Sequence, residues 1–340
     1  MVEASAAISR AALLLAALAA GCDQPAPTEV PPSWQVVFEH LPGAVLRVIG
    51  TKHDDVTIVG ADPDGQGPLV MHFDGARWKK LHPGVTGDLW WSFPVGPEEV
   101  RMVGDDGQIV RFNPKTETFS AGSAPTHERL FGVWSSSPND VWMVGGATAR
   151  NRGVMWHDEG SGPSAPTHLP TVTSSAALFK AQGFSANAVW FVGQAGTLIR
   201  YDGAQFETFP AITHYPLMGL HGSAPDRVYA VGGVAGGVIL AFDGTSWKDE
   251  SPKDLPQMIA VWAVDADEAY AAGFNGSLYH RKDGAWTKVT PRLPTFVDLH
   301  SIWVDEKGGI WLAGGRLALD PPTDGVLLYY GPPLSKEVIE

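Results

Sequence analysis

Short stretches in which apolar and polar residues alternate recur along most of this chain. The clearest set comprises seven six-residue segments, each of which ends in glycine. They are DVTIVG (Asp55–Gly60), EVRMVG (Glu99–Gly104), DVWMVG (Asp140–Gly145), AVWFVG (Ala188–Gly193), RVYAVG (Arg227–Gly232), EAYAAG (Glu268–Gly273) and GIWLAG (Gly309–Gly314). Alternation of this kind is typical of β-strands, because successive side chains of a strand point to opposite faces. The pattern therefore predicts an all-β protein.

Each segment belongs to a longer four-part repeat. An apolar strand precedes it, and it is followed by a third strand that ends near Asp-Gly and a fourth that carries Trp or Phe. The terminal glycines lie 39 to 48 residues apart along the chain. This spacing is typical of four-stranded propeller blades. Residues 33–331 are therefore predicted to form one seven-bladed β-propeller with four-stranded antiparallel blades.

Turn residues divide the repeats into strands. We expect the terminal glycine of each second strand to adopt a positive φ where the chain turns toward the third strand. Four Asp-Gly pairs are predicted to join strands three and four as tight hairpins, at residues 74–75, 202–203, 243–244 and 283–284. The aromatic residues that follow them are interpreted as blade-packing residues rather than sugar-stacking platforms. They are Trp78, Phe206, Trp247 and Trp286.

The two ends of the repeat region complement each other. The seventh repeat has no fourth strand, because Pro332-Pro333 follows GVLLYYG (Gly325–Gly331). The segment SWQVVFEHLPG (Ser33–Gly43) instead resembles the outer strand of the first repeat. Residues 33–38 are therefore predicted to supply the missing strand of the last blade, which would pair two exposed edges. Residues 332–340 then form a C-terminal tail.

The N-terminal segment is typical of an export signal. Arg10 precedes the apolar run AALLLAALAA (Ala11–Ala20), which is about half the ~20 residues that a membrane span needs. Residues 18–22 (LAAGC) resemble the lipobox of bacterial lipoproteins, which implies a lipid on Cys22; an ordinary signal peptide is the alternative. Residues 1–22 are read as this signal peptide and residues 23–32 (DQPAPTEVPP) as a Pro-rich tether. The implied location is the bacterial cell envelope, periplasmic or at the cell surface.

Charge and motif content exclude several functions. The formal net charge of −13 disfavours binding to nucleic acid and to anionic lipid surfaces. Cys22 is the only cysteine, which excludes an internal disulfide and a cysteine-based zinc cluster. The chain contains no G-x-S-x-G, H-E-x-x-H or G-x-x-x-x-G-K-[ST] motif. No catalytic residue and no cofactor are therefore predicted.

Two loops carry weaker patterns. ADPDGQG (Ala61–Gly67) places Asp62 and Asp64 at alternate positions, as a calcium site would. The glutamate expected at the end of an EF-hand loop is replaced by phenylalanine, and a polar loop is the alternative. The long connections of the third repeat bring Arg150 and Arg152 to an otherwise acidic chain. They are a candidate contact surface, because function concentrates in loops on a rigid scaffold; a tolerated insertion is the alternative.

Five histidines recur at related places, in the connections between one repeat's last strand and the next repeat's first strand. They are His40, His82, His127, His168 and His214. Such connections gather on one face of a propeller, around the channel mouth, where neutral imidazoles could bind a metal or an anionic group. A turn residue copied by repeat duplication is the alternative. The identity of any metal stays open.

Three segments carry a resemblance to known proteins: LFGVWSSSPNDVWMVGG (Leu130–Gly146), GTLIRYDG (Gly196–Gly203) and ILAFDGTSW (Ile239–Trp247). They resemble the repeats of secreted bacterial propeller lipoproteins, which are similar to Asp-box propellers and to propellers of the photosystem II stability-factor type. The serine of the strict Asp-box is absent here. The resemblance implies a fold and not a function.

The functional hypothesis is a lipid-anchored, non-enzymatic module that binds a protein or a glycan through one propeller face. One alternative is an envelope polysaccharide lyase or hydrolase with its site at the channel mouth. Another is a purely structural envelope component without a ligand pocket.

Overall fold

A computed structural model describes residues 31–290 and 293–339. The chain divides into two units, residues 1–31 and residues 32–340, and all the strands lie in the second. Cys22, the signal peptide and the tether up to residue 30 lie outside the described residues. Within the described part, no helix is long and apolar enough to cross a membrane.

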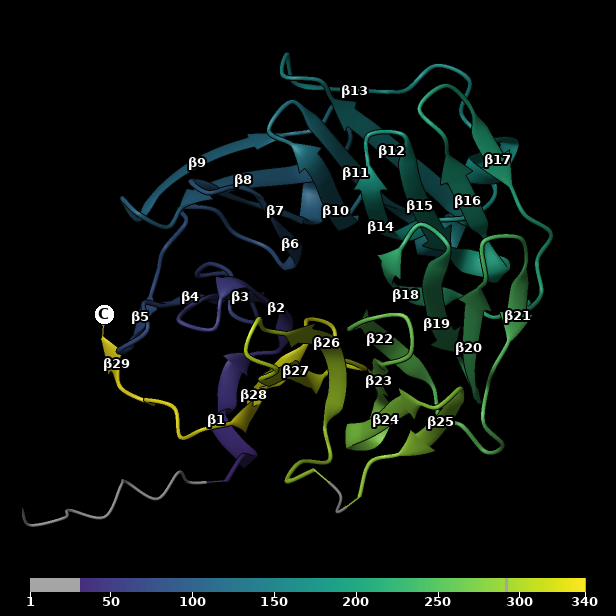
Figure 1. Ribbon diagram of the computed structural model, residues 1–340. Helices are drawn as coiled ribbons and strands as arrows, with labels where there is room; N and C mark the ends of the chain where they lie inside the picture. Colours follow the sequence, from purple (N-terminus) through teal and green to yellow (C-terminus); the bar gives the residue numbers. More distant parts are fainter. Residues whose placement is uncertain (1–30, 291–292, 340) are drawn as a thin grey trace, which may run out of the picture. The chain divides into compact units, whose positions relative to one another are not determined.

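The described residues from 32 onward form seven sheets, each with four antiparallel strands, that succeed one another around a ring, which confirms the seven-bladed propeller (Figure 1). In each sheet the first strand in the order below lies innermost. Blades 1 to 3 contain β2 (Val45–Lys52), β3 (Asp55–Gly60), β4 (Val70–Phe73) and β5 (Trp78–Lys80); β6 (Leu89–Gly96), β7 (Glu99–Gly104), β8 (Gln108–Asn113) and β9 (Thr118–Ser123); β10 (Leu130–Ser137), β11 (Asp140–Ala147), β12 (Arg152–Asp158) and β13 (Pro163–Ser164). Blades 4 and 5 contain β14 (Leu178–Ser185), β15 (Ala188–Gly193), β16 (Leu198–Tyr201) and β17 (Phe206–Thr208); β18 (Leu217–Ala224), β19 (Arg227–Gly233), β20 (Gly237–Phe242) and β21 (Trp247–Asp249). Blades 6 and 7 contain β22 (Met258–Ala263), β23 (Ala269–Gly273), β24 (Ser277–Lys282) and β25 (Ala285–Lys288); β26 (Asp298–Val304), β27 (Ile310–Arg316), β28 (Thr323–Gly331) and β1 (Ser33–Gly43).

The N-terminal strand closes the ring, as predicted. Strand β1 pairs antiparallel with β28 and becomes the outer strand of the seventh blade, with Ser33 opposite Gly331. It extends to Gly43, beyond the predicted end at residue 38, and irregularities interrupt its register on both sides of Phe38. The first and last blades are thus joined by backbone hydrogen bonds of a strand that lies far from β28 in the sequence.

The C-terminal residues add a fifth strand to blade 1. Strand β29 (Val338–Ile339) runs parallel to β5, and the backbone N–H of Trp78 donates to the carbonyl of Glu337 at 2.7 Å. On the way there, the N–H of Leu334 donates to the side chain of Gln35 in β1 at 3.1 Å. Residues beyond 331, read from the sequence as a tail, therefore contact both blades at the ring closure.

The terminal glycines of the second strands correct one expectation. None of the seven has a positive φ. In blades 2, 4 and 6 the left-handed residues come after the glycine and are Asp106, Ala195 and Asn275. What the glycines allow is close approach: a Cβ at each would overlap a backbone carbonyl oxygen at the start of the same blade's innermost strand, at residues 44, 88, 129, 177, 216, 257 and 298. Glycine is required there by contact and not by φ.

The outer aromatic residues pack between blades, which confirms their structural interpretation. Each lies against an aromatic ring on the second strand of the preceding blade. The ring centroids are 6.2 Å apart for Trp78 and Trp311, 5.9 Å for Phe206 and Trp142, 5.2 Å for Trp247 and Trp190, and 5.6 Å for Trp286 and Tyr229. The core is therefore a series of inter-blade layers.

Candidate functional site

One residue from each innermost strand lines an open cavity at the centre of the ring. In every blade this residue lies four positions after the first paired leucine, valine or methionine of the innermost strand, as Phe93 lies four positions after Leu89. The seven are Ile49, Phe93, Trp134, Gln182, His221, Trp262 and Trp303. We call this cavity the funnel. Because the seven strands share one register, this single repeat position contributes one side chain from every blade, and neighbouring residues such as Arg47, Gly50 and Ser185 complete the wall.

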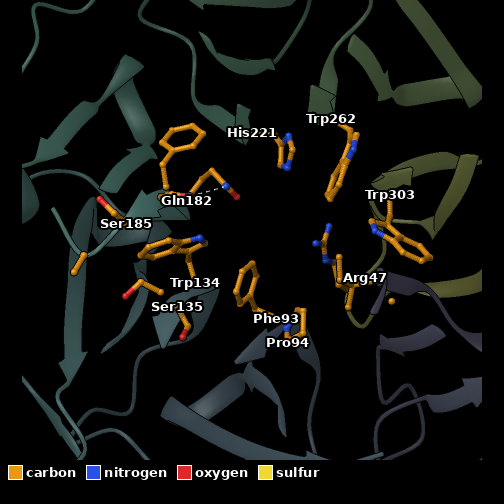
Figure 2. A pocket seen from close by; sticks show the side chains of 16 residues that line it. Arg47, Phe93, Pro94, Trp134, Ser135, Gln182, Ser185, His221, Trp262 and Trp303 are labelled. Carbon is orange, nitrogen blue, oxygen red and sulfur yellow. Dashed lines mark hydrogen bonds between the residues drawn. The ribbon is translucent and has the colours of Figure 1, made fainter. Parts of the chain in front are cut away.

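The funnel measures about 750 Å³, within the range of ligand-binding pockets. It opens on the face where the innermost strands end and turn toward the second strands, since its lining includes late residues of those strands such as Gly50, Pro94 and Ser136. Figure 2 shows the labelled side chains arranged around this opening. Five of the seven ring positions carry an aromatic or imidazole ring, so the wall offers flat apolar surfaces.

Below the funnel lies a space of about 20 Å³ that shares Arg47, Phe93, Gln182, His221 and Trp262 with it. It has room for a single water-sized group. The guanidinium of Arg47 reaches toward the middle of the ring (Figure 2). Its Nε and Nη1 atoms donate long hydrogen bonds to the carbonyl of Ser92 (3.4 Å) and the hydroxyl of Ser301 (3.3 Å).

Deeper in the channel, two cations flank one tryptophan. The Arg47 Cζ atom lies 4.0 Å from the ring centroid of Trp91, and the Lys180 Nζ atom lies 3.9 Å from it. Lys180 also donates to the carbonyl of Phe131 at 3.1 Å. Burial lowers the pKa of Arg47 to about 9, and burial together with the nearby Arg47 charge lowers the pKa of Lys180 to about 7. Arg47 is therefore charged at neutral pH, while the pKa of Lys180 lies well below the usual range of a lysine.

The histidines of the channel are neutral. Burial lowers the pKa of His221 and of His300 to about 3 in each case. His221 stacks on Trp262 with centroids 3.9 Å apart, and its Nδ1 accepts the N–H of Ala263 at 3.0 Å. The proton of this imidazole is thus on Nε2. The charged group of the funnel, the Arg47 guanidinium, is a hydrogen-bond donor, and no aspartate or glutamate of the described residues lines the funnel.

The five histidines singled out in the sequence lie elsewhere. All are exposed on the face opposite the funnel opening. His82, His127, His168 and His214 stand in connections that lead into innermost strands, whereas His40 lies within β1, because that strand extends to Gly43. His40 and His127 contact Asp324 and Asp106, at 2.8 and 2.7 Å. The histidines form no shared site, since His82, His127 and His168 line three separate depressions. Over the described part of the chain, no group of three or more His, Cys, Asp or Glu side chains is placed to hold a metal.

In the loop that was predicted as a calcium candidate, Asp62 and Asp64 accept hydrogen bonds from backbone N–H groups. The Asp62 carboxylate accepts the N–H groups of Gly67 (3.0 Å) and Gly87 (2.8 Å), and Asp64 accepts that of Gln66 (3.2 Å). These contacts use the carboxylates to fix the backbone of the loop, which fits the polar-loop alternative.

The two candidate contact arginines flank a turn of blade 3. Arg150 ends the 3₁₀ turn η2 (Thr148–Arg150) and lines a depression on the histidine-bearing face. Arg152 begins β12 and pairs with Glu128 at 3.3 Å. The long connection that follows, residues 159–175, contains the outer strand β13 and the turn η3 (Thr171–Ser174), so part of it belongs to the blade.

Comparison with known proteins agrees with the fold. No protein-family model matches the chain, and no curated protein matches its sequence. Among solved structures, it is similar to the RRP9 WD40 repeats, with 11% identity, TM-score 0.69 and coverage of 90% of this chain and 100% of that one. It is also similar to YCF48 from Cyanidioschyzon merolae, with 14% identity, TM-score 0.67 and coverage of 88% and 98%.

A third similar structure is the extracellular domain of the hybrid two-component system BT3049 from B. thetaiotaomicron. It has 12% identity and TM-score 0.62, and the match covers 86% of this chain and 41% of that one. At these identities the likeness establishes the seven-bladed propeller and nothing finer.

Proposed function

We propose that this protein is a non-enzymatic interaction module that binds a polypeptide segment of a partner in the funnel. The observation that carries the proposal is the single ring of seven side chains around an open cavity of about 750 Å³. Aromatic side chains with few rotatable bonds, such as Trp134, Trp262 and Trp303, are the anchors that protein-binding sites favour. Propellers similar to this one include WD40 repeats and bacterial extracellular domains.

The chemistry of the funnel argues against the rival glycoside hydrolase. Glycoside hydrolysis uses two carboxyl groups that flank the scissile bond, and none of the described side chains lining the funnel is a carboxylate. His221 cannot replace them as a general acid near neutral pH, because burial lowers its pKa to about 3. The funnel offers aromatic surfaces and the hydrogen-bond donors of Arg47, and this combination suits recognition of a ligand.

The proposal includes a place in the cell. The lipobox-like segment LAAGC at residues 18–22 supports a lipid on Cys22 and a position in the bacterial envelope. A short tether at residues 23–32 would then hold the propeller near the membrane surface, periplasmic or at the cell surface. Similarity of the fold to bacterial extracellular propeller domains supports the same placement.

Site-specific photocrosslinking tests the binding face. A photoreactive residue replaces Ser185, an exposed residue of the funnel wall, in the full chain expressed in intact cells. The matched control replaces Tyr215, which is 42% exposed in the connection between β17 and β18 on the opposite face. We expect a discrete protein adduct at position 185 and none at position 215.

A second variant separates binding from random collision. Trp262→Ala removes a half-buried wall residue, and we expect it to reduce the adduct at position 185 at least fivefold while circular dichroism shows a folded propeller. Equal adducts at both positions, or a glycan in place of protein at position 185, would refute the polypeptide proposal.

A further inference from the structure

Among the described residues of the propeller, two arginine side chains are almost completely buried, and they differ in their partners. Arg101 is 1% exposed, and its guanidinium pairs with Glu99 at 2.6 Å and Asp158 at 3.0 Å. Arg47 is 5% exposed and, within residues 31–290 and 293–339, has no carboxylate partner. A buried charge without a counter-charge is costly, since water no longer solvates it. The fold thus neutralises one buried arginine and leaves the other facing the funnel.

A second cation strengthens the positive potential at the same place. Lys180 is 4% exposed, lies over the same Trp91 ring as Arg47, and hydrogen-bonds to the neutral carbonyl of Phe131. His221 and His300, the other titratable groups that face this region, are neutral. The floor of the funnel, which Arg47 forms with Lys180 beneath it, is therefore positive inside a chain whose net charge is −13.

We propose that the floor of the funnel binds a carboxylate carried by the polypeptide that occupies the funnel. The inference rests on the proposed function and names the group that the site recognises. The planar guanidinium of Arg47 matches a carboxylate with two parallel hydrogen bonds. Aromatic rings of the wall, such as Phe93 and Trp262, contact the apolar part of the residue that bears it.

The net charge of the protein indicates why the carboxylate belongs to a larger ligand. A chain at −13 repels free small anions at long range. An anion that is attached to an apolar group gains burial against the funnel wall, which offsets that repulsion. The site therefore selects an anionic group joined to an apolar neighbour, and this combination occurs at a peptide C-terminus and beside an acidic side chain.

A matched pair of small probes tests the floor directly. Benzoate carries a carboxylate on an aromatic ring, and benzamide is its neutral counterpart of the same shape. Binding to the full chain is followed by calorimetry and by tryptophan fluorescence, since Trp91 contacts Arg47. We expect benzoate to bind at least tenfold more tightly than benzamide, because a charge-assisted pair forms only with the carboxylate. Equal affinities would overturn the proposal.

Two arginine variants localise the effect. Arg47→Met replaces the guanidinium by an apolar chain of similar length, which buried sites generally tolerate. We expect it to weaken benzoate binding at least tenfold and to leave benzamide binding unchanged. Arg200→Met is the control, because Arg200 also lies over a tryptophan, 5.7 Å from Trp190, but outside the funnel. Benzoate affinity that survives Arg47→Met, or that falls equally in Arg200→Met, would overturn the assignment.

Short peptides then identify the source of the carboxylate. The tripeptide acetyl-Gly-Gly-Phe with a free C-terminus and acetyl-Gly-Glu-Phe-amide each present one carboxylate, and acetyl-Gly-Gly-Phe-amide presents none. If the first peptide binds more tightly, the carboxylate that pairs with Arg47 is a C-terminus. If the second peptide binds more tightly, that carboxylate belongs to an acidic side chain. No preference over the neutral peptide would overturn the proposal for polypeptides.

The two proposals fail separately. A protein adduct at Ser185 that persists in Arg47→Met keeps the funnel as a polypeptide site and refutes the carboxylate. Benzoate binding through Arg47 without any protein adduct refutes the polypeptide and keeps the anion site.

Discussion

The two ends of the propeller channel are built from different parts of the backbone repeat. At the end where the histidine-bearing connections enter, seven glycines let the second strands approach the start of the innermost strands. The Cα of each glycine lies close to a backbone carbonyl of the innermost strand or of the residue before it. At the other end, seven side chains diverge around the funnel. One end is held by backbone contact and tolerates no added atom, whereas the other is left open and its side chains vary from isoleucine to tryptophan.

This difference separates positions that hold the fold from positions that are free to serve recognition. The glycine positions are the same in all seven blades. The funnel positions share a register but hold five residue types, and the charge at the floor comes from Arg47 alone among the cavity's lining residues at neutral pH. Substitutions at the two ends should therefore affect different measurements.

The largest effect on stability is expected at the glycine end. In Gly145→Ala the new methyl group overlaps the carbonyl oxygen of Arg129, which is backbone and cannot rotate away. We expect a loss of about 3 kcal/mol in the free energy of unfolding, as overpacking of a rigid site produces. Chemical denaturation measures it. The control Gly122→Ala lies on the exposed strand β9 with open space around its Cβ, and a comparable loss there would show that the close approach is not the cause.

A smaller effect, dependent on pH, is expected from the buried lysine. Its pKa is lowered from 10.5 to about 7 in the folded protein, so between these values the unfolded chain binds more protons and the stability of the fold rises with pH. Lys180→Met removes that dependence. The variant should gain about 2 kcal/mol more over the wild type at pH 6 than at pH 9.

Denaturant unfolding at the two pH values measures this difference. Lys288→Met, which changes an exposed lysine of β25, is the matched control and should show no such pH dependence. A gain that is equal at both pH values would mean that Lys180 keeps its proton throughout this range, and that neither burial nor the Arg47 charge lowers its pKa.

The fold was predictable because its determinants are local and repeated. The DVWMVG-type segments, the Asp-Gly turns and the strand-like Ser33–Gly43 segment each specify a strand or a turn from neighbouring residues. Even so, the role of the terminal glycines was misread, because their constraint is a contact with a strand that starts about 15 residues earlier, and this is invisible in a local φ argument.

The site was not predictable in the same way. Histidines drew attention as reactive residues in repeated loops, yet the structure spreads His40, His82 and His127 over an exposed face. Aligning the innermost strands, for example LWWSF (Leu89–Phe93) with LFGVW (Leu130–Trp134), would have shown the fifth position of the ring. That Arg47 lacks a carboxylate could not be read from sequence, since any of the 37 acidic residues might have faced it.

The smallest effect on stability is expected from substitutions on the histidine-bearing face. They test whether the exposed side chains at this end of the channel, unlike its glycines, contribute little to stability. His127 is 95% exposed and contacts only the exposed Asp106. His214 is likewise exposed. Because water replaces such contacts, the double change His127→Ala and His214→Ala should shift the melting temperature by less than about 2 °C. It should also leave benzoate affinity unchanged, since both residues lie opposite the funnel. Elemental analysis of wild type and variant completes the test. A metal that is present in the wild type and lost from the variant would restore these histidines as ligands and place a second site at the end of the channel that the glycines hold together.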